Sequence, residues 1–300
     1  MGAYQAFCKT EEMCIVSLPI VFIHRTAEDH VGLCMQQAKY SNPSSRVILI
    51  GSPENKYLSA ENTEHFLLSR FYQSAQAFSF VYKHSTSNTY EYNLFCFQRW
   101  FILRDFMRSQ GIERCCYLDS DVMLYTDISK RDNEDFDDFT FEYTWTTVCD
   151  LEKLNQFCDY ATKFFRDPLH YQTLLQFAKE IGDAPISDMV LFILFHNYAL
   201  RRKATYGIVA NGFFDHNLNC PFAPSCPQAD SQDGKKQIYQ KNGALYCKIT
   251  GTTDYLSAHS LHFQGHSKAY IPYFRSQDIP NTDDFMYFDY PTCKWVPAKP

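Results

Sequence analysis

The chain has 300 residues, of which 45% are hydrophobic and 17% aromatic, so it can bury a large core within one globular domain. Its formal net charge of −6 argues against a nucleic acid as the main partner, because nucleic-acid-binding proteins usually carry a basic surface. No segment approaches the roughly 20 consecutive apolar residues of a membrane span, and the N-terminus has no basic segment followed by an apolar run. We therefore expect a compact cytoplasmic protein with no membrane span.

The first half of the chain alternates apolar runs with helical patterns, which is typical of a parallel α/β sheet. Apolar residues recur at three- and four-residue spacing from Leu94 to Met107, which indicates an amphipathic helix that Gly111 ends. The expected elements are, in chain order, a strand at 20–23, a helix at 31–39, a strand at 46–50, helices at 63–77 and 94–109, and a strand at 115–118.

The second half has fewer regular patterns. An acidic run at 131–138 is expected to be a loop. The tail after 280 is expected either to bind an acceptor or to pack on the sheet. The other expected elements are helices at 169–181 and 187–202, an ordered loop at 211–234, and a β-hairpin at 237–249 that turns at Asn242-Gly243.

Twelve cysteines are scattered along the chain, and several lie in apolar runs where a buried thiol is ordinary. The sequence contains no C-x-x-C pair, which argues against a cysteine zinc site. Most of the cysteines are therefore expected to be reduced, in agreement with a cytoplasmic location. Cys220 and Cys226, in a proline-rich loop, are the best candidates for an exception.

Two carboxylates, Asp119 and Asp121, directly follow the apolar run that ends at Leu118. Carboxylates at positions i and i+2 at the end of a buried strand converge on one hard cation if the chain bends there. A cation that is only partly neutralised can then bind a diphosphate. The pair therefore predicts a divalent metal site.

A second segment, at 260–268, has chemistry that complements the two aspartates. A neutral imidazole from His262 would be a good third ligand for Mn²⁺. Gly265 would let backbone amides approach a phosphate, and the ammonium of Lys268 would neutralise phosphate oxygens. Taken alone, a histidine in an apolar strand is more often a core or surface residue than a ligand.

These two segments resemble the motifs of one enzyme family. Tyr117-Leu118-Asp119-Ser120-Asp121-Val122 is similar to the Y-L-D-x-D-V metal motif of glycosyltransferases with the GT-A fold. His262-Phe263-Gln264-Gly265-His266-Ser267-Lys268 is similar to the H-F-x-G-x-x-K motif of family 8, the retaining galactosyl- and glucosyltransferases related to glycogenin. The resemblance covers about 20–270, although the stretches between the motifs match only in pattern.

The resemblance implies an α/β protein with the GT-A fold. Such a fold has a central, mostly parallel, twisted sheet flanked by helices, here with a small antiparallel hairpin region and a C-terminal extension. One glycosyltransferase domain would span 1–300, with its core at about 15–270 and the extension at 271–300.

The resemblance also implies roles for the matching residues. Asp119, Asp121 and His262 would bind Mn²⁺ or Mg²⁺, while Gly265 and Lys268 would contact the diphosphate of the donor. Lys268 would in addition stabilise the leaving group during the reaction. The donor of such enzymes is a nucleotide-sugar, usually linked to UDP, from which a hexose passes with retention to a hydroxyl of a glycan, glycolipid or glycoprotein acceptor.

Three further residues match the family less closely. Arg99 corresponds to an arginine on the helix before the metal strand that approaches the donor. Asp188 corresponds to part of a D-Q-D-like run beside the donor sugar, where it acts in catalysis, or it is an ordinary acidic residue in the first turn of a helix. His24, at the end of the first strand, lies where the family binds the donor base and ribose.

Other readings of the aspartate pair remain open. A haloacid-dehalogenase-type phosphatase also begins with D-x-D after an apolar strand, but Met123 stands where that class has Thr or Val. A nucleotidyltransferase would need a glycine-rich loop after the first strand, and the residues after His24 contain no glycine there. A non-catalytic protein that binds nucleotide-sugars or glycans would keep the same ligands.

Overall fold

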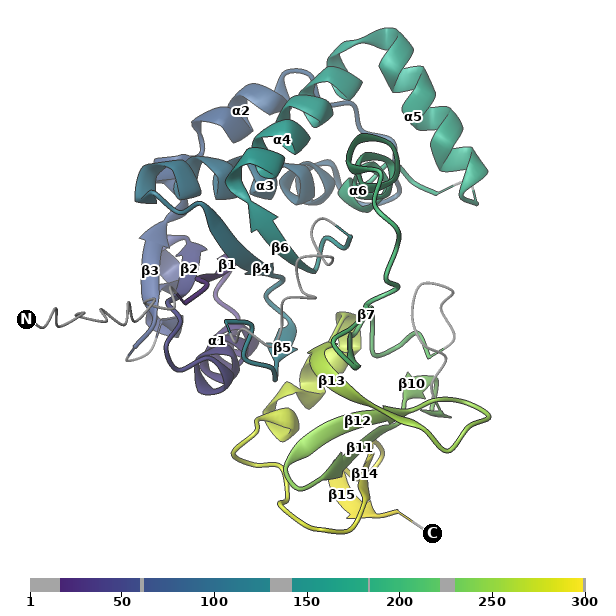
Figure 1. Cartoon of the computed structure of the whole chain (residues 1–300). Helices are drawn as coiled ribbons and strands as arrows, with labels where there is room; N and C mark the ends of the chain where they lie inside the picture. The colour runs from purple at the N-terminus through teal and green to yellow at the C-terminus, as the bar shows by residue number, and fades with distance from the viewer. Residues whose placement is uncertain (1–16, 60–61, 130–141, 183, 222–229, 299–300) are drawn as a thin grey trace, which may run out of the picture.

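The computed structural model describes residues 17–59, 62–129, 142–182, 184–221 and 230–298. Figure 1 shows an α/β part, in which helices cover a sheet, and below it a β-rich part that contains the C-terminus. The acidic run at 131–138 and Cys226 lie outside the described residues. Among the helices that the structure describes, none is long and apolar enough to cross a bilayer.

The first sheet has the strand order β3-β2-β1-β4-β6. Strands β1 to β4 run parallel, while β6 runs antiparallel to β4. The bounds are β1 Ile20–His24, β2 Val47–Gly51, β3 Glu64–Leu67, β4 Arg114–Leu118 and β6 Thr146–Asp150. The predicted mostly parallel sheet flanked by helices is confirmed.

Helices cover both faces of this sheet because its central strands are apolar on both sides. In β1, Ile20 and Phe22 pack in the core cluster that includes α1, whereas Val21 and Ile23 pack in the cluster that includes α3. The bounds are α1 Asp29–Ser41, α2 Gln73–Ser79, α3 Tyr90–Gln110, α4 Leu151–Arg166, α5 Pro168–Glu180 and α6 Asp188–Leu194, which continues as the π-helix η4 Phe195–Leu200. Short 3₁₀ helices are η1 Pro53–Leu58, η2 Leu68–Phe71 and η5 Gly265–Phe274.

Helix α3 is capped at both ends, and Gly111 follows its last residue as the sequence predicts. The Thr89 side chain accepts a hydrogen bond from the backbone N–H of Tyr92 at its start, and Gly111 takes the left-handed conformation, φ +61°, at its end. The helix therefore has defined ends as well as a buried face, which fixes the position of Arg99 in its middle.

One expectation about the helices is wrong, and one helix and one strand were missed. The segment at 63–77 begins as β3 and η2, and only its end is helical, because the residues at 64–67 pair with β2 at the sheet edge. Helix α4 and strand β6 were not predicted. The signal for α4 is present in the sequence, because Leu154, Phe157, Cys158 and Ala161 recur at helical spacing and are buried.

The second sheet has the order β15-β14-β11-β12-β13-β8-β7, and β5 also pairs with β13. Its bounds are β5 Val122–Leu124, β7 Ile208–Val209, β8 Gly212–Phe214, β11 Ile238–Lys241, β12 Ala244–Lys248, β13 Tyr255–His262, β14 Met286–Asp289 and β15 Lys294–Pro297. A separate two-stranded ribbon consists of β9 Ser231–Gln232 and β10 Lys235–Lys236.

The hairpin of β11 and β12 turns where the sequence predicts. Asn242 and Gly243 both have positive φ, 52° and 74°, as a two-residue turn of this handedness requires. The antiparallel region is nevertheless larger than the small hairpin expected. Of the two alternatives for the tail, packing on the sheet is the one observed, because β14 pairs with β11 and Phe288 is fully buried.

Candidate functional site

The Asp-x-Asp turn lies where the chain leaves the first sheet for the second. Strand β4 ends at Leu118 in the first sheet, and β5 begins at Val122, which pairs with His262 of β13 in the second. The N–H of Asp119 donates to the Trp145 carbonyl at 2.8 Å, and the carbonyl of Asp121 accepts from the Phe263 N–H at 2.9 Å. Each aspartate is thus attached through its backbone to a different part of the molecule.

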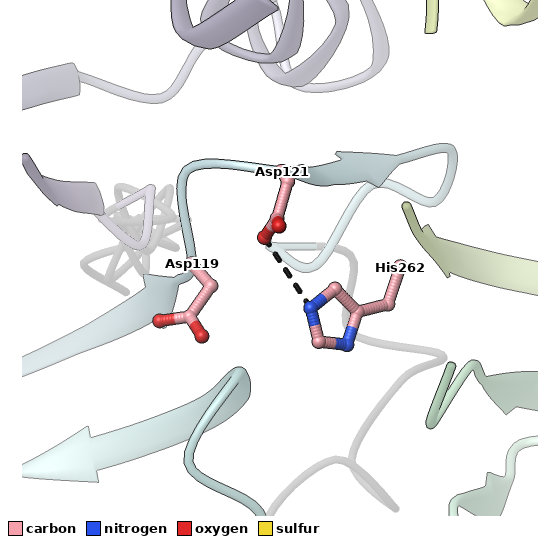
Figure 2. Close-up of side chains that lie close together, drawn as sticks. All are labelled: Asp119, Asp121 and His262. Carbon is pink, nitrogen blue, oxygen red and sulfur yellow. Dashed lines mark ion pairs between the residues drawn. The ribbon is translucent and has the colours of Figure 1, made fainter. Parts of the chain in front are cut away.

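Asp119, Asp121 and His262 converge, as Figure 2 shows. One ligand atom from each of the three lies within 4.8 Å of the others. The His262 Nε2 lies 3.3 Å from Asp121 Oδ1, and its Nδ1 donates to the His216 carbonyl at 2.7 Å. Because a carbonyl only accepts, Nδ1 carries the proton and Nε2 faces the carboxylates, which is the orientation of a metal-ligating histidine.

Burial and mutual contacts shift the pKa values of the three groups. Burial raises the pKa of Asp119. Burial also opposes the charge of Asp121, but its hydrogen bond and ion pair with His262 outweigh this and hold the pKa of Asp121 at about 2. The same contact raises the pKa of His262 although burial lowers it. Two hard carboxylates and one borderline imidazole form a ligand set that suits Mn²⁺, and less well Mg²⁺.

A buried ion pair behind His262 was not predicted from the sequence. The carboxylate of Asp215 accepts from the His262 backbone N–H at 3.1 Å and forms an ion pair with the Lys236 ammonium. Lys236 also donates to the Asn217 carbonyl at 3.2 Å. The run Phe213-Phe214-Asp215-His216 gave a signal, since it places two polar residues directly after an apolar strand, but Lys236 had none.

Arg99 supports Asp119 from the side of the first sheet. Its guanidinium donates to Asp119 Oδ1, to the Tyr117 hydroxyl at 3.1 Å and to Asp188 Oδ2 at 2.7 Å. Trp100 Nε1 donates to the same oxygen of Asp188 at 3.1 Å. Asp188, at the start of α6, is only 3% exposed. Its carboxylate is therefore held by Arg99 and Trp100 and is largely shielded from water.

A cavity of about 340 Å³ opens beside these residues. Its lining includes five of the residues predicted from the sequence: His24, Arg99, Asp119, Asp121 and Lys268. His262, Asp188 and Gly265 are not among the lining residues. Gly265 has φ +62°, and a Cβ added there would meet nothing within 4 Å, so the space over its backbone is open.

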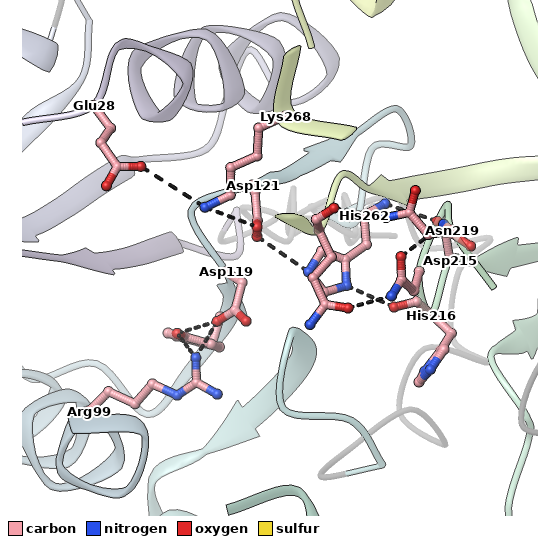
Figure 3. A network of polar contacts seen from close by, with 12 residues as sticks. Glu28, Arg99, Asp119, Asp121, Asp215, His216, Asn219, His262 and Lys268 are labelled. Atoms are coloured by element: carbon pink, nitrogen blue, oxygen red, sulfur yellow. Dashed lines mark hydrogen bonds and ion pairs between the residues drawn. The ribbon is translucent and has the colours of Figure 1, made fainter. Parts of the chain in front are cut away.

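Lys268 lies between two carboxylates of this cavity. Its Nζ is 3.5 Å from Asp121 Oδ2 and 4.0 Å from Glu28 Oε2, so a row of ion pairs runs from Glu28 to His262 (Figure 3). His24 lines the wall nearby, where its Nε2 lies 2.8 Å from the Thr26 hydroxyl. Burial lowers the pKa of His24 to about 4, so its imidazole is neutral near pH 7.

Comparisons with known proteins give only distant similarities. No protein-family model matches the sequence, and no curated protein matches it. Mouse xyloside xylosyltransferase 1 is similar in structure, with 13% identity, a TM-score of 0.42, and coverage of 61% of this chain and 83% of that one. An active-site mutant of LgtC gives 10% identity, a TM-score of 0.38 and coverage of 83% and 88%.

The glycosyltransferase GlyE of Streptococcus pneumoniae TIGR4 has 12% identity and a TM-score of 0.31, over 61% of this chain and 43% of that one. Likeness at this level carries no conclusion about the chemistry of this chain.

Proposed function

We propose that this protein is a metal-dependent glycosyltransferase of the GT-A fold, related to family 8, that moves a hexose from a UDP-linked sugar to an acceptor hydroxyl with retention. One observation carries the proposal. Asp119 and Asp121 meet His262 from a distant part of the chain, beside a cavity that also contains Lys268. The two motifs that resemble this family are thus adjacent in space.

The site fits a divalent cation and a diphosphate. Asp119, Asp121 and His262 would hold Mn²⁺ or Mg²⁺, and the cation would supply positive charge to the diphosphate of the donor. Lys268 would neutralise the phosphate that leaves, and the open space over Gly265 would admit a phosphate to the backbone. His24 lines the same cavity and would contact the nucleoside.

The transfer exchanges one bond for another. A bond forms between the acceptor hydroxyl oxygen and the anomeric carbon while the bond from that carbon to the diphosphate oxygen breaks. The hydroxyl proton passes to the departing diphosphate, so no base from the protein is required. Negative charge grows on the leaving group, where Lys268 stabilises it more strongly in the transition state than in the bound donor.

Asp188 is assigned a positioning role in this proposal. Its Oδ2 accepts hydrogen bonds from both Arg99 and Trp100, and its side chain is 4% exposed, so it is poorly placed to attack the sugar as a nucleophile. Through Arg99 it instead holds the carboxylate of Asp119 in place.

The test is donor binding and hydrolysis. UDP-, GDP- and ADP-sugars are screened by thermal shift with and without Mn²⁺, since a ligand that binds only the folded state raises the unfolding temperature. We expect stabilisation by a UDP-sugar that requires Mn²⁺, and slow release of UDP without acceptor. Asp121→Asn should abolish both effects, whereas Asp150→Asn, at the far end of β6 and paired with Lys153, should retain them.

Other outcomes favour the rival functions. Binding of a nucleotide-sugar without hydrolysis or transfer would indicate a non-catalytic binding protein. Release of phosphate from small phosphomonoesters would indicate a phosphatase. Unchanged turnover in Asp121→Asn would reject the metal assignment.

A further inference from the structure

A second, smaller cavity adjoins the candidate metal ligands. Its volume is about 110 Å³, and it shares no lining residue with the larger cavity. Trp145 connects it to the metal ligands, because its ring stacks on His262 at 5.8 Å between centroids and its carbonyl accepts from the Asp119 N–H. The pocket is lined by Tyr143, Trp145, Met189, Phe192, Ile193 and His216, together with Thr144 and with Glu142, whose carboxylate accepts hydrogen bonds from Thr205 and Tyr206.

The mouth of the pocket is apolar and partly exposed. Met189 and Ile193 lie one turn apart on α6 and are 44% and 39% exposed, although the neighbouring residues of that helix are buried. Asp188 precedes Met189 and is bound to Arg99. Helix α6 therefore faces the metal ligands through Asp188 and presents its apolar side chains to the second cavity.

Two buried nitrogen atoms of the pocket residues lack a partner within the described ranges of the chain. Trp145 is only 5% exposed, yet its Nε1 has no hydrogen-bond acceptor there. The Nδ1 atom of His216 is also buried and also has no hydrogen-bond partner among the described residues. Buried polar atoms are almost always paired in native proteins, so these two mark polar positions within the walls of a largely apolar pocket.

We propose that the pocket binds an apolar group of the acceptor, an aryl or short alkyl aglycone attached to the sugar. The inference rests on the proposed transferase function and specifies its acceptor class. The volume, about 110 Å³, is smaller than the roughly 150 Å³ cavity that takes up benzene, but the pocket is open at Met189 and Ile193, which are partly exposed. A free sugar would leave the apolar wall of Met189 and Ile193 in contact with water.

The proposal is tested by saturation-transfer NMR on the full chain with UDP and diamagnetic Mg²⁺, because paramagnetic Mn²⁺ beside the pocket would broaden the ligand signals. Phenyl β-D-glucoside and phenyl β-D-galactoside are compared with the free sugars. We expect the phenyl protons to receive more saturation than the sugar protons. Ile193→Asp should weaken phenyl glycoside binding at least about tenfold, because it places a charge at the apolar mouth.

The matched control is Leu169→Asp, which puts the same charge on an exposed apolar residue of α5, 72% exposed, away from the pocket. It should bind phenyl glycosides as the unmodified chain does. Circular dichroism and the unfolding temperature check that both variants are folded. Equal phenyl saturation in the two variants, or none in the unmodified chain, would overturn the inference.

Hydrolysis of UDP-sugars in the same samples separates this inference from the proposed function. Hydrolysis without phenyl saturation rejects the aglycone pocket and leaves the transferase function intact. Phenyl saturation that Ile193→Asp removes, in a protein that hydrolyses no nucleotide-sugar, rejects the transferase function and with it the acceptor role of the pocket.

Discussion

The α/β part and the β-rich part each support one candidate metal ligand with a buried ion pair. In the α/β part, Arg99 pairs with Asp188 and donates to the side chain of Asp119. In the β-rich part, Asp215 pairs with Lys236 and accepts from the backbone N–H of His262. The first pair holds the side chain of Asp119, and the second holds the backbone of β13 at His262.

The two pairs differ in burial and in the elements that carry them. The side chains of Arg99 and Asp188 are 11% and 4% exposed and lie on helices, whereas those of Lys236 and Asp215 are 2% and 0% exposed and lie in or beside short strands. The second pair holds together segments that have little regular structure of their own. The first pair thus links two regular helices, whereas the second links two short segments through side-chain charge.

The largest effect is expected for Lys236→Met, because it leaves the carboxylate of Asp215 fully buried without its ion-pair partner. Breaking a buried pair in this way lowers the free energy of unfolding by roughly 3–5 kcal/mol. Urea unfolding measures the change. Lys248→Met removes a surface pair with Asp230, at 3.9 Å, and should cost less than about 1 kcal/mol.

A double variant sharpens this prediction. Lys236→Met with Asp215→Asn removes both charges and should recover part of the lost stability, because no uncompensated buried charge remains. Equal destabilisation by Lys236→Met and Lys248→Met would show that the buried pair does not hold the β-rich part together.

Arg99→Met should be the next most damaging change. It leaves the carboxylates of Asp119 and Asp188 without their shared cation, at a cost of about 3 kcal/mol, since Arg99 is slightly more exposed than Lys236. Arg46→Met, which removes the exposed pair with Glu64, is the control and should change stability by less than about 1 kcal/mol. If both variants unfold at the same urea concentration, the proposed support of Asp119 is wrong.

Lys268→Met is expected to affect activity and leave stability nearly unchanged. Loss of one group that stabilises transition-state charge lowers kcat by about 10²–10³-fold. The side chain is 35% exposed, so the folded state should lose under about 0.5 kcal/mol. Lys248, 34% exposed, is the matched control, and Lys248→Met should keep full UDP-sugar hydrolysis. Similar rates in the two variants would remove Lys268 from the proposed mechanism.

The smallest effects are expected at two glycines that have nearly the same backbone geometry. Gly265 and Gly111 have φ of 62° and 61°, and a Cβ at either would meet nothing within 4 Å. Alanine at each should therefore cost a similar roughly 1–2 kcal/mol of backbone strain. Only Gly265→Ala should also weaken binding of UDP with Mn²⁺ in calorimetry. Equal UDP affinities would argue against a phosphate over Gly265.

The sequence alone determined most of the α/β part. Apolar runs and helical spacing are local patterns, so β1, β2, α1, α3 and β4 could be located, together with the aspartates that follow β4. Helix α4 had an equally local pattern and was missed, while β3 was mistaken for helix because pairing at the sheet edge outweighed its helical spacing. Arg99 was proposed from the resemblance of its helix to that of the family, and the helix itself had a local signal.

The way in which the site is assembled depends on the tertiary structure. His262 faces Asp121 because β13 pairs with β5, and that pairing joins segments far apart in the chain. Lys236 meets Asp215 through packing of short strands and loops that have no periodic signal. Such contacts depend on the three-dimensional path of the chain, so the residue types suggested a metal site while the fold determined the ligand geometry and its buried supports.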